Sequence, residues 1–192
     1  MEQEFSVKDR ILSAALSLFA DRGYDSVGVQ EIVTVCGITK PTLYYYFGSK
    51  IGLLEAVIDV YGEKMIRMLE RAAEYDHDLV RHLTDLLNAQ IEFASGNPEF
   101  FRLHNALSFA AAGSDAFRVH AGFQKRISDC FHGLFIKSSQ EFGNMRGREL
   151  LFSRNFYAVT VSAALSVLNG EIPHDSDTVY RIVHSFIYGI AN

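Results

Sequence analysis

The chain has 192 residues, 48% of them hydrophobic and 21% charged, a balance typical of a folded globular protein rather than a disordered one. Its net charge of −5 is unusual for a nucleic-acid binder, which commonly carries a basic patch. Two cysteines, Cys36 and Cys130, are too few for a disulfide framework or a metal cluster. We therefore expect buried thiols in a reducing cytoplasm, with no metal and no other cofactor.

The first ten residues, MEQEFSVKDR, lack the positive region and apolar core of a secretion signal. The longest apolar run, at about residues 158–168, is interrupted by Thr160, Ser162 and Ser166. It is too short and too polar to span a membrane. The sequence therefore predicts a cytoplasmic protein that does not enter a membrane.

Two helices are predicted before residue 37. The first begins at Ser6, with Asp9 three residues later as the partner of a capping box. Apolar residues then recur at helical spacing until Gly23 ends the helix. A shorter helix follows at about residues 29–36, with Gly28 as its N-cap.

The next segment, GITKPTLYYYFGSK at residues 37–50, contains three consecutive tyrosines. Tyrosine and phenylalanine favour strands, so propensity alone predicts a strand. However, Thr39 is a good N-cap, and Pro41 stands in the first turn, where a missing N–H costs little. A helix also places Leu43 and Phe47 on one side and fans the tyrosines across the other. We therefore predict a helix, which together with the preceding one forms a helix-turn-helix.

The second helix of such a motif enters the major groove of DNA. Lysine and tyrosine donate to phosphate oxygens, and threonine can reach a base edge. Lys50, in the first turn of the next helix, adds a cation beside backbone N–H groups that attract an anion. Because successive helical positions point about 100° apart, three consecutive tyrosines cannot all be core. At least one must face solvent, and a protein–protein surface is the alternative to a DNA surface.

The rest of the chain is also predicted to be helical, which gives an all-α fold of about nine helices. The fourth helix starts at about residue 49 and connects to the remainder. We find no repeat and no flexible linker, so we place the domain boundary near residue 50 on functional grounds. The expected helices from this point are about 49–75, 78–94, 98–111, 116–142, 147–168 and 175–190.

Residues 7 to about 58 resemble the DNA-binding domain of the TetR family of transcriptional repressors. The resemblance rests on ILSAALSLFADRGYDS, VQEIVTVCGITKPTLYYYF and GSKIGLLEAV, in which glycine, LYxxF and lysine recur at the family's spacing. It implies a helix-turn-helix DNA-binding domain at residues 1–50 and an effector-binding and dimerisation domain at residues 51–192. It also implies a homodimer that binds a palindromic operator in double-stranded DNA and is released by a small molecule.

The same resemblance assigns DNA contacts. Two departures from the family pattern accompany them: Val27 and Gly28 replace the usual threonine or serine, which removes a side-chain cap and its phosphate contact. Gly52 replaces the usual acidic partner of Ser49, so we expect the fourth helix to begin more weakly. The positions that match the family's contacts are Gln30, Thr39, Lys40, Pro41, Thr42, Tyr44, Tyr45, Tyr46 and Lys50.

The charge of the N-terminal region limits how DNA can be held. Residues 1–50 contain five Lys or Arg and six acidic residues, a balance of −1. Lys40 and Lys50 lie in the proposed DNA face, whereas Glu2 and Glu4 lie near the N-terminus. Because the salt dependence of binding scales with the phosphates that are neutralised, we expect a shallow salt slope.

The last two predicted helices carry apolar residues interspersed with small ones, which suits close pairing across a two-fold axis. We therefore expect the homodimer to form through the helices at about residues 147–168 and 175–190; core helices of a monomer are the alternative. The middle helices are rich in phenylalanine with a few polar residues among them, as ligand sites are. The residues proposed for an effector pocket are Phe101, His104, Asn105, His120, Phe123 and Phe156.

We expect most of these rings to be ordinary core. For the pocket residues the hypothesis is an apolar effector, with aromatic or planar molecules as first candidates. No catalytic residue is assigned, because the seven histidines form no HExxH motif and GNMRGREL lacks the preceding strand of a phosphate loop. The sequence therefore predicts a sequence-specific DNA-binding transcriptional regulator, a repressor, and not an enzyme. The alternative is an all-helical enzyme or a protein-interaction module whose N-terminal bundle does not bind DNA.

Overall fold

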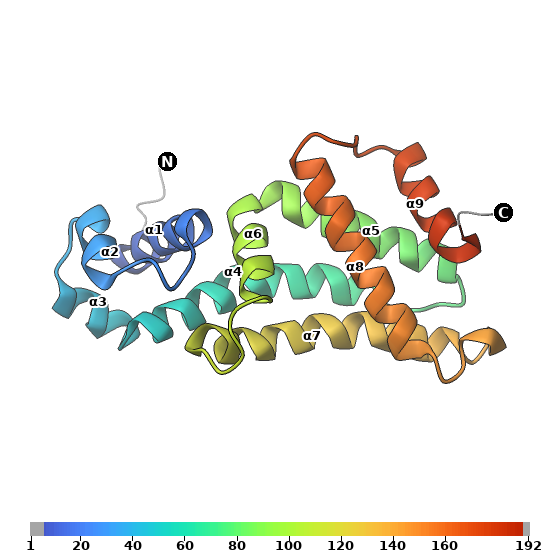
Figure 1. Cartoon of the computed structure of the whole chain (residues 1–192), viewed down its shortest axis with the longest axis horizontal. Coiled ribbons are helices and arrows are strands. Elements are labelled where there is room, and N and C mark those ends of the chain that lie inside the picture. The colour runs from blue at the N-terminus through green and yellow to red at the C-terminus, as the bar shows by residue number, and fades with distance from the viewer. Residues whose placement is uncertain (1–5, 190–192) are drawn as a thin grey trace. The chain divides into compact units, whose positions relative to one another are not determined.

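A computed structural model describes residues 6–189 of the chain (Figure 1). This range contains nine α-helices, one short 3-10 helix and no strand, which confirms the predicted all-α fold of about nine helices. Glu2, Glu4 and the predicted end of the last helix at residue 190 lie outside the described residues. The helices are α1 (Val7–Arg22), α2 (Val29–Cys36), α3 (Lys40–Phe47), α4 (Lys50–Ala72), α5 (Leu79–Gly96), α6 (Pro98–Leu107), α7 (Asp115–Ser138), η1 (Gly143–Met145), α8 (Glu149–Leu168) and α9 (Ser176–Tyr188).

Contacts divide the chain into two compact units, which we call unit 1 and unit 2. Unit 1 contains the chain up to Glu63 together with Glu99–Gln124, so that α1, α2, α3 and α6 belong to it. Unit 2 contains Lys64–Pro98 and the chain from Lys125 onward, including α5, α8 and α9. The boundary predicted near residue 50 was placed by function, and it stays a prediction.

Unit 1 begins with the predicted capping box. The Ser6 hydroxyl accepts from the Asp9 N–H at 3.2 Å, and the Asp9 carboxylate accepts from the Ser6 N–H at 3.2 Å. Helix α2 starts at Gly28 with no side-chain cap, as its sequence predicts. It ends at Gly37, whose φ of 62° is the left-handed conformation that glycine adopts without strain.

The junction between α3 and α4 explains the unexpected glycine at position 52. The Ser49 hydroxyl accepts from the Gly52 N–H at 3.0 Å, so α4 has one half of a capping box. A Cβ atom at position 52 would lie 2.1 Å from the carbonyl oxygen of Phe47. Glycine therefore allows the last residue of α3 to approach the first turn of α4 closely.

Unit 2 is built around α5, which lies beside α8 and also contacts α9 (Figure 1). Phenylalanine rings fill much of its core. Phe156 is fully buried and its ring centroid lies 4.8 Å from that of Phe186 and 6.3 Å from that of Phe131. Most of the rings predicted to be core in this unit are therefore core.

Several predicted helix ends differ from the structure, among them that of α4, which ends at Ala72 rather than near 75. Helix α6 ends at Leu107 rather than near 111, and α7 ends at Ser138 rather than near 142. Between α6 and α7 the chain turns, Phe109 is 90% exposed, and the Ser114 hydroxyl accepts from the Phe117 N–H to begin α7. The next helix, predicted from about residue 147, is α8, which starts at Glu149 and follows the short helix η1.

Helix α8 has the length and apolar composition of a membrane span, although no other helix in residues 6–189 does. Only 28% of its most apolar stretch is buried in the single chain. The predicted absence of a membrane stays a prediction. Helix α8 leaves much of its apolar surface exposed in the single chain.

Candidate nucleic-acid interface

Helix α3 exposes its tyrosines. Tyr44, Tyr45 and Tyr46 are 44%, 84% and 39% exposed, whereas Leu43 is fully buried. The Thr39 hydroxyl caps the helix by accepting from the Thr42 N–H, and Pro41 stands in the first turn. The helix predicted over this segment is therefore confirmed. It holds three phenol groups on the outer side of a stem that is fixed by its buried face.

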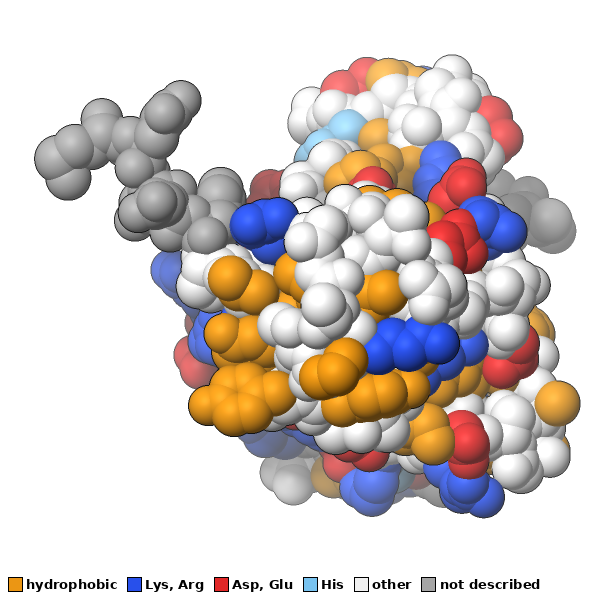
Figure 2. Space-filling view, turned by 90° about the vertical axis from the view of Figure 1, so that its left-hand side faces the viewer, with side chains coloured by type: hydrophobic (Ala, Val, Ile, Leu, Met, Phe, Trp, Pro, Cys, Tyr) orange, Lys and Arg blue, Asp and Glu red, His pale blue; other side chains and the backbone are white. Residues whose placement is uncertain are grey.

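The other predicted contacts on this surface are solvent-accessible as well. Thr39, Lys40, Pro41 and Gln30 are exposed. Figure 2 looks onto the side of unit 1 that carries these helices and shows a band of hydrophobic side chains, tyrosine among them, with Lys and Arg side chains in between. Hydroxyl and ammonium donors beside flat apolar rings are what a surface that reaches phosphates and base edges needs.

Lys50 is held in place by an aromatic ring. Its ammonium lies 4.1 Å from the centroid of Tyr24, a cation–π contact. Burial lowers the pKa of Lys50 from its usual value. Burial, followed by nearby acids of which Asp115 contributes most, raises the pKa of Tyr24 to about 12. Tyr24 is therefore neutral at pH 7, and Lys50, the first residue of α4, holds its side-chain nitrogen over the Tyr24 ring.

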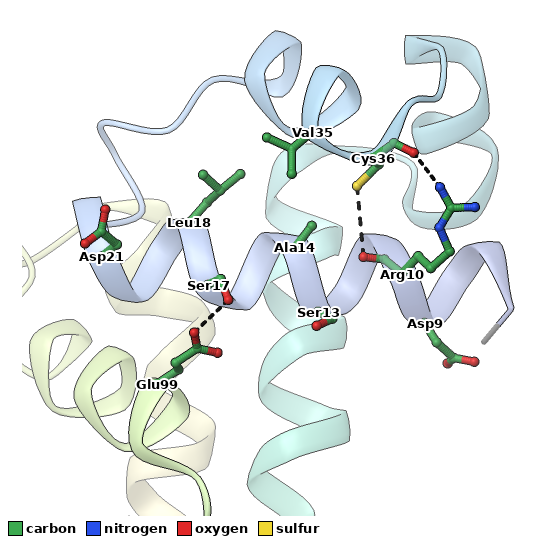
Figure 3. Close-up of a pocket in the computed structure, with 10 residues that line it drawn as sticks. All are labelled: Asp9, Arg10, Ser13, Ala14, Ser17, Leu18, Asp21, Val35, Cys36 and Glu99. Carbon is green, nitrogen blue, oxygen red and sulfur yellow. Dashed lines mark hydrogen bonds between the residues drawn. The ribbon is translucent and has the colours of Figure 1, made fainter. Parts of the chain in front are cut away.

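A groove of about 730 Å³ runs along α1 in unit 1, and Figure 3 shows how its walls are joined. The Arg10 guanidinium donates to the carbonyl oxygen of Cys36 at 2.8 Å, which satisfies a carbonyl at the end of α2. The Ser17 hydroxyl donates to the Glu99 carboxylate at 2.7 Å. The groove residues thus fix α2 and α6 to α1, and Arg10 orients the helix-turn-helix rather than facing DNA.

A second arginine is also engaged within the motif, because Arg22 forms an ion pair with Glu31 of α2. Lys40, in contrast, has no ion-pair partner among residues 6–189. Of the basic residues in the motif, Lys40 and Lys50 are therefore those available to phosphate. This agrees with the shallow salt slope expected from the sequence.

The six residues predicted for an effector pocket are distributed over both units. In unit 1, His104 Nδ1 and His120 Nε2 lie 2.7 Å apart, and the ring of Phe123 packs against both. Burial lowers the pKa of His104 to about 3 and that of His120 to about 4, so both are neutral at pH 7. Phe100, which the prediction omitted, stacks on His104.

The remaining predicted pocket residues behave differently. Phe101 is fully buried, and the Asn105 amide donates to the Phe101 carbonyl within α6 at 2.8 Å. Phe156 belongs to unit 2. Sequence reasoning missed Gln90, a fully buried glutamine in α5 of unit 2. In the sequence it stands out as a polar residue within an apolar helical stripe, four positions after Leu86 and three after Leu87.

No group of three or more histidine, cysteine or acidic side chains in residues 6–189 is arranged to hold a metal ion. Cys36 is buried, and burial raises the pKa of its thiol.

Comparisons with known proteins agree with the candidate nucleic-acid interface. Residues 11–57 match the family model of bacterial regulatory proteins of the tetR family. The transcriptional activator FasR of Mycolicibacterium smegmatis is 25% identical over 182 residues, which is 95% of this chain and 81% of that protein. The transcriptional repressor BdcR of Escherichia coli is 43% identical over 53 residues, 28% of this chain and 27% of that protein.

Solved structures show the same fold over nearly the whole chain. The TetR family regulator PfmR from Thermus thermophilus superposes with a TM-score of 0.74 at 18% identity, covering 98% of this chain and 99% of that one. FadR from Bacillus subtilis, solved in complex with stearoyl-CoA, superposes with a TM-score of 0.72 at 16% identity, covering 94% and 98%. Residues 11–57 therefore form a DNA-binding domain of the TetR family of transcriptional regulators, and the chain as a whole shares the fold of TetR family proteins.

Proposed function

We propose that this protein is a homodimeric repressor in the cytoplasm that binds a palindromic operator through α3 and releases it when a small apolar molecule binds. The observation that carries the proposal is the exposure of Tyr44, Tyr45 and Tyr46 on a helix whose opposite side, at Leu43, is fully buried. Exposed aromatic side chains on a rigid helix of a helix-turn-helix are placed to contact a duplex. Thr39, Lys40, Pro41 and Thr42 complete the contact surface on this helix.

Two cations supply the electrostatic part of the proposed contact. Lys40 begins α3, and Lys50 lies over Tyr24 beside the first N–H groups of α4. Gln30 in the first turn of α2 is exposed and adds a neutral contact to the sugar–phosphate backbone. The phenol groups add donors without charge, which suits an N-terminal region whose balance is −1.

The dimer is proposed to form through α8 and α9. Helix α8 has an apolar surface of which little is covered in one chain, and Leu150 and Leu151 are 49% and 56% exposed. On α9, Tyr180, His184 and Tyr188 stack along one exposed side, with centroids 5.3 and 4.5 Å apart. Monomeric proteins rarely expose such contiguous apolar surface, and a second copy would cover it across a two-fold axis.

For release, two α3 helices must sit about one DNA turn, roughly 34–36 Å, apart to enter successive major grooves. A ligand that favours another separation lowers DNA occupancy in proportion to its difference in affinity for the two arrangements. The residues proposed to sense it are Phe101, His104, Asn105, His120 and Phe123 in unit 1 and, separately, Phe156 in unit 2. The neutral histidine pair among aromatic rings supports an apolar, uncharged effector.

Activation is the second candidate, because the relative that matches over 95% of this chain bears the name of an activator. A gel-shift with the DNA upstream of the chain's own gene tests binding, and a reporter on that DNA tests the sign of regulation. Repression requires reporter output to fall when the protein is present and to recover with effector. Failure to shift any fragment of that DNA would count against the whole proposal.

A further inference from the structure

The core of unit 2 contains a polar side chain, Gln90, without a hydrogen-bond partner in residues 6–189. Gln90 is fully buried, and among the described residues neither its side-chain nitrogen nor its side-chain oxygen has a hydrogen-bond partner. Asn88 on the same helix, in contrast, accepts from His174 at 3.0 Å. A buried unpaired amide destabilises a folded protein, so its retention requires a reason.

Gln90 points into the unit, not along its surface. The exposed or half-exposed residues of α5 fall on one side, represented by Asp85, Asn88 and Glu92. At about 100° per residue, position 90 lies nearly opposite position 88. On the inward side Gln90 follows Leu86 and Leu87, both fully buried. The amide therefore interrupts an otherwise apolar inner surface.

An apolar pocket of about 280 Å³ opens at the other end of the same helix face. Leu83 of α5 lines it together with the rings of Phe135, Phe152 and Phe186. At its rim Phe142 and Tyr188 are 41% and 54% exposed. Leu83 and Gln90 are two helical turns apart, about 10 Å, on one side of α5.

Aromatic rings continue from the pocket into the interior between α5 and α8. Phe156 follows Phe152 by one turn of α8, and its ring contacts Phe135 and Phe186 of the pocket wall. Thr160, one turn further, is fully buried, and its hydroxyl donates to the Tyr157 carbonyl at 2.8 Å. Helices α5 and α8 are the most extensively packed pair in the unit. The inward residues of α5 and those of α8 therefore border the same interior.

The charged groups of the pocket lie at its mouth. Asp78 caps α5 by accepting from the Arg81 N–H, and His77 bonds to the exposed Glu141 at 2.6 Å. The inner surface near Gln90 offers an amide donor and an amide acceptor but no counter-charge on α5. An ion buried there would be unpaired and strongly unfavourable.

We propose that Gln90 is the polar anchor of a ligand site in unit 2, which takes an elongated apolar molecule with an uncharged hydroxyl, carbonyl or amide at its buried end. The apolar body of this molecule occupies the aromatic pocket, and its polar end bonds to the Gln90 amide. The inference rests on the proposed function, because it names the chemical class of the effector and places it beside Phe156.

The decisive variant is Gln90→Met, which removes the amide and keeps the length of the side chain. Without ligand, its melting temperature should rise by about 2–4 °C, because an unpaired buried amide is removed. The matched control is Asn88→Met, which removes a bonded, outward-facing amide of the same helix and should not raise the melting temperature. A fall in the melting temperature of Gln90→Met would show that the amide has a structural partner, and would overturn the proposal.

Ligand binding is tested with three probes that share a butylphenyl body: 4-butylphenol, 4-butylbenzamide and 4-butylbenzoate, each at about 1 mM, the affinity range of such small ligands. The first two should stabilise the wild type and the charged third should not. Gln90→Met should lose at least about tenfold in affinity for both neutral probes, while Asn88→Met should bind as the wild type does. Leu79→Trp, which fills the pocket rim, should lose binding although Gln90 remains.

Measuring DNA binding and probe binding separately distinguishes failure of this inference from failure of the proposed function. Free Gln90→Met protein should bind operator DNA as tightly as the wild type in a gel-shift, since Gln90 lies in unit 2. Intact DNA binding with equal probe affinity in wild type and Gln90→Met would overturn the ligand site alone. Intact DNA binding with no stabilisation of the wild type by any of the probes would do the same. Loss of DNA binding in the wild type would instead contradict the proposed function.

Discussion

Helices α3 and α5 both depart from the usual preference of side chains for burial or exposure, in opposite ways. Helix α3 exposes three tyrosines, which are usually at least partly buried, whereas α5 buries Gln90, which would usually face solvent. Neither departure improves the stability of the chain on its own. The comparison teaches that side chains placed against the usual preference are candidates for binding: we propose a duplex as the partner of α3 and a small apolar molecule as the partner of α5.

The largest expected effect comes from removing the three hydroxyls of α3. The triple variant Tyr44→Phe, Tyr45→Phe, Tyr46→Phe should lose on the order of 10⁴-fold in operator affinity, because a dimer loses six hydroxyls and each hydrogen bond to a phosphate contributes roughly 1 kcal/mol. Its melting temperature should stay unchanged, since the phenol groups are exposed. Fluorescence anisotropy with labelled DNA measures the affinity.

The control for the triple variant removes an exposed hydroxyl elsewhere. Ser95→Ala on α5 of unit 2, which lies on neither the proposed DNA surface nor the proposed dimer surface, should leave DNA affinity unchanged. Equal affinity of the α3 variant and the wild type would mean that the outward tyrosines serve another partner, and the contrast with α5 would fail.

The next effect tests the junction that positions α3. Gly52→Ala should destabilise the protein by about 2 kcal/mol, because the new Cβ would meet the Phe47 carbonyl and force the backbone apart. DNA affinity should fall with it, as α3 shifts relative to α4. The matched control is Gly122→Ala in α7, where no atom lies within 4 Å of the new Cβ and where stability should rise by about 0.5–1 kcal/mol. Urea unfolding of both variants measures the difference; destabilisation of both to the same degree would contradict the steric argument.

A smaller effect concerns pH. His104 and His120 have pKa values of about 3 and about 4 in the folded protein, below the unfolded value of about 6.5. The unfolded state therefore binds more protons as pH falls below that value, and stability is lost on acidification. From pH 7.5 to pH 6 the two histidines should together lower the free energy of unfolding by about 1.5 kcal/mol.

Chemical denaturation at the two pH values, compared with the double variant His104→Phe, His120→Leu, checks this. The double variant removes both partners of one hydrogen bond together, which is close to neutral at high pH, and should show a smaller loss on acidification. An equal loss in the double variant would show that other groups are responsible.

The smallest effect is on the salt slope of DNA binding. With Lys40 and Lys50 in each of two copies, about four phosphates are neutralised, and the logarithm of affinity should fall with the logarithm of salt with a slope of about −4. Lys50→Gln should make this slope about 2 less steep, because a dimer loses two such contacts. Titrations at several salt concentrations measure it, and a wild-type slope steeper than about −8 would place the contact surface elsewhere.

The sequence predicted what local chemistry controls. Helix α3 is predictable despite its strand-favouring composition, from Thr39, Pro41 and the apolar pair Leu43 and Phe47. The start of α1 is predictable from Ser6. The helix ends near Leu107 and Ser138 were misjudged, because alanine-rich and glycine-containing segments leave a turn and a helix close in energy.

Tertiary contacts account for what the sequence could not show. Gly52 looked like a missing cap, and only the approach of Phe47 gives it a steric role. The histidine pair was placed in a pocket with Phe156, yet contacts assign them to different units. Gln90 was overlooked, because an isolated polar residue in an apolar stripe has a meaning only when its partners, or their absence among residues 6–189, are known.

The most direct test of the central claim is hydroxyl-radical footprinting of the full-length protein on the DNA upstream of its own gene. If α3 of each copy enters a major groove, the wild type should protect two half-sites about 10 base pairs apart, centre to centre, or a whole multiple of one turn. The triple tyrosine variant should protect neither. Protection that persists unchanged in that variant, or no protected site for a folded wild type, would contradict the claim that the outward side of α3 binds DNA.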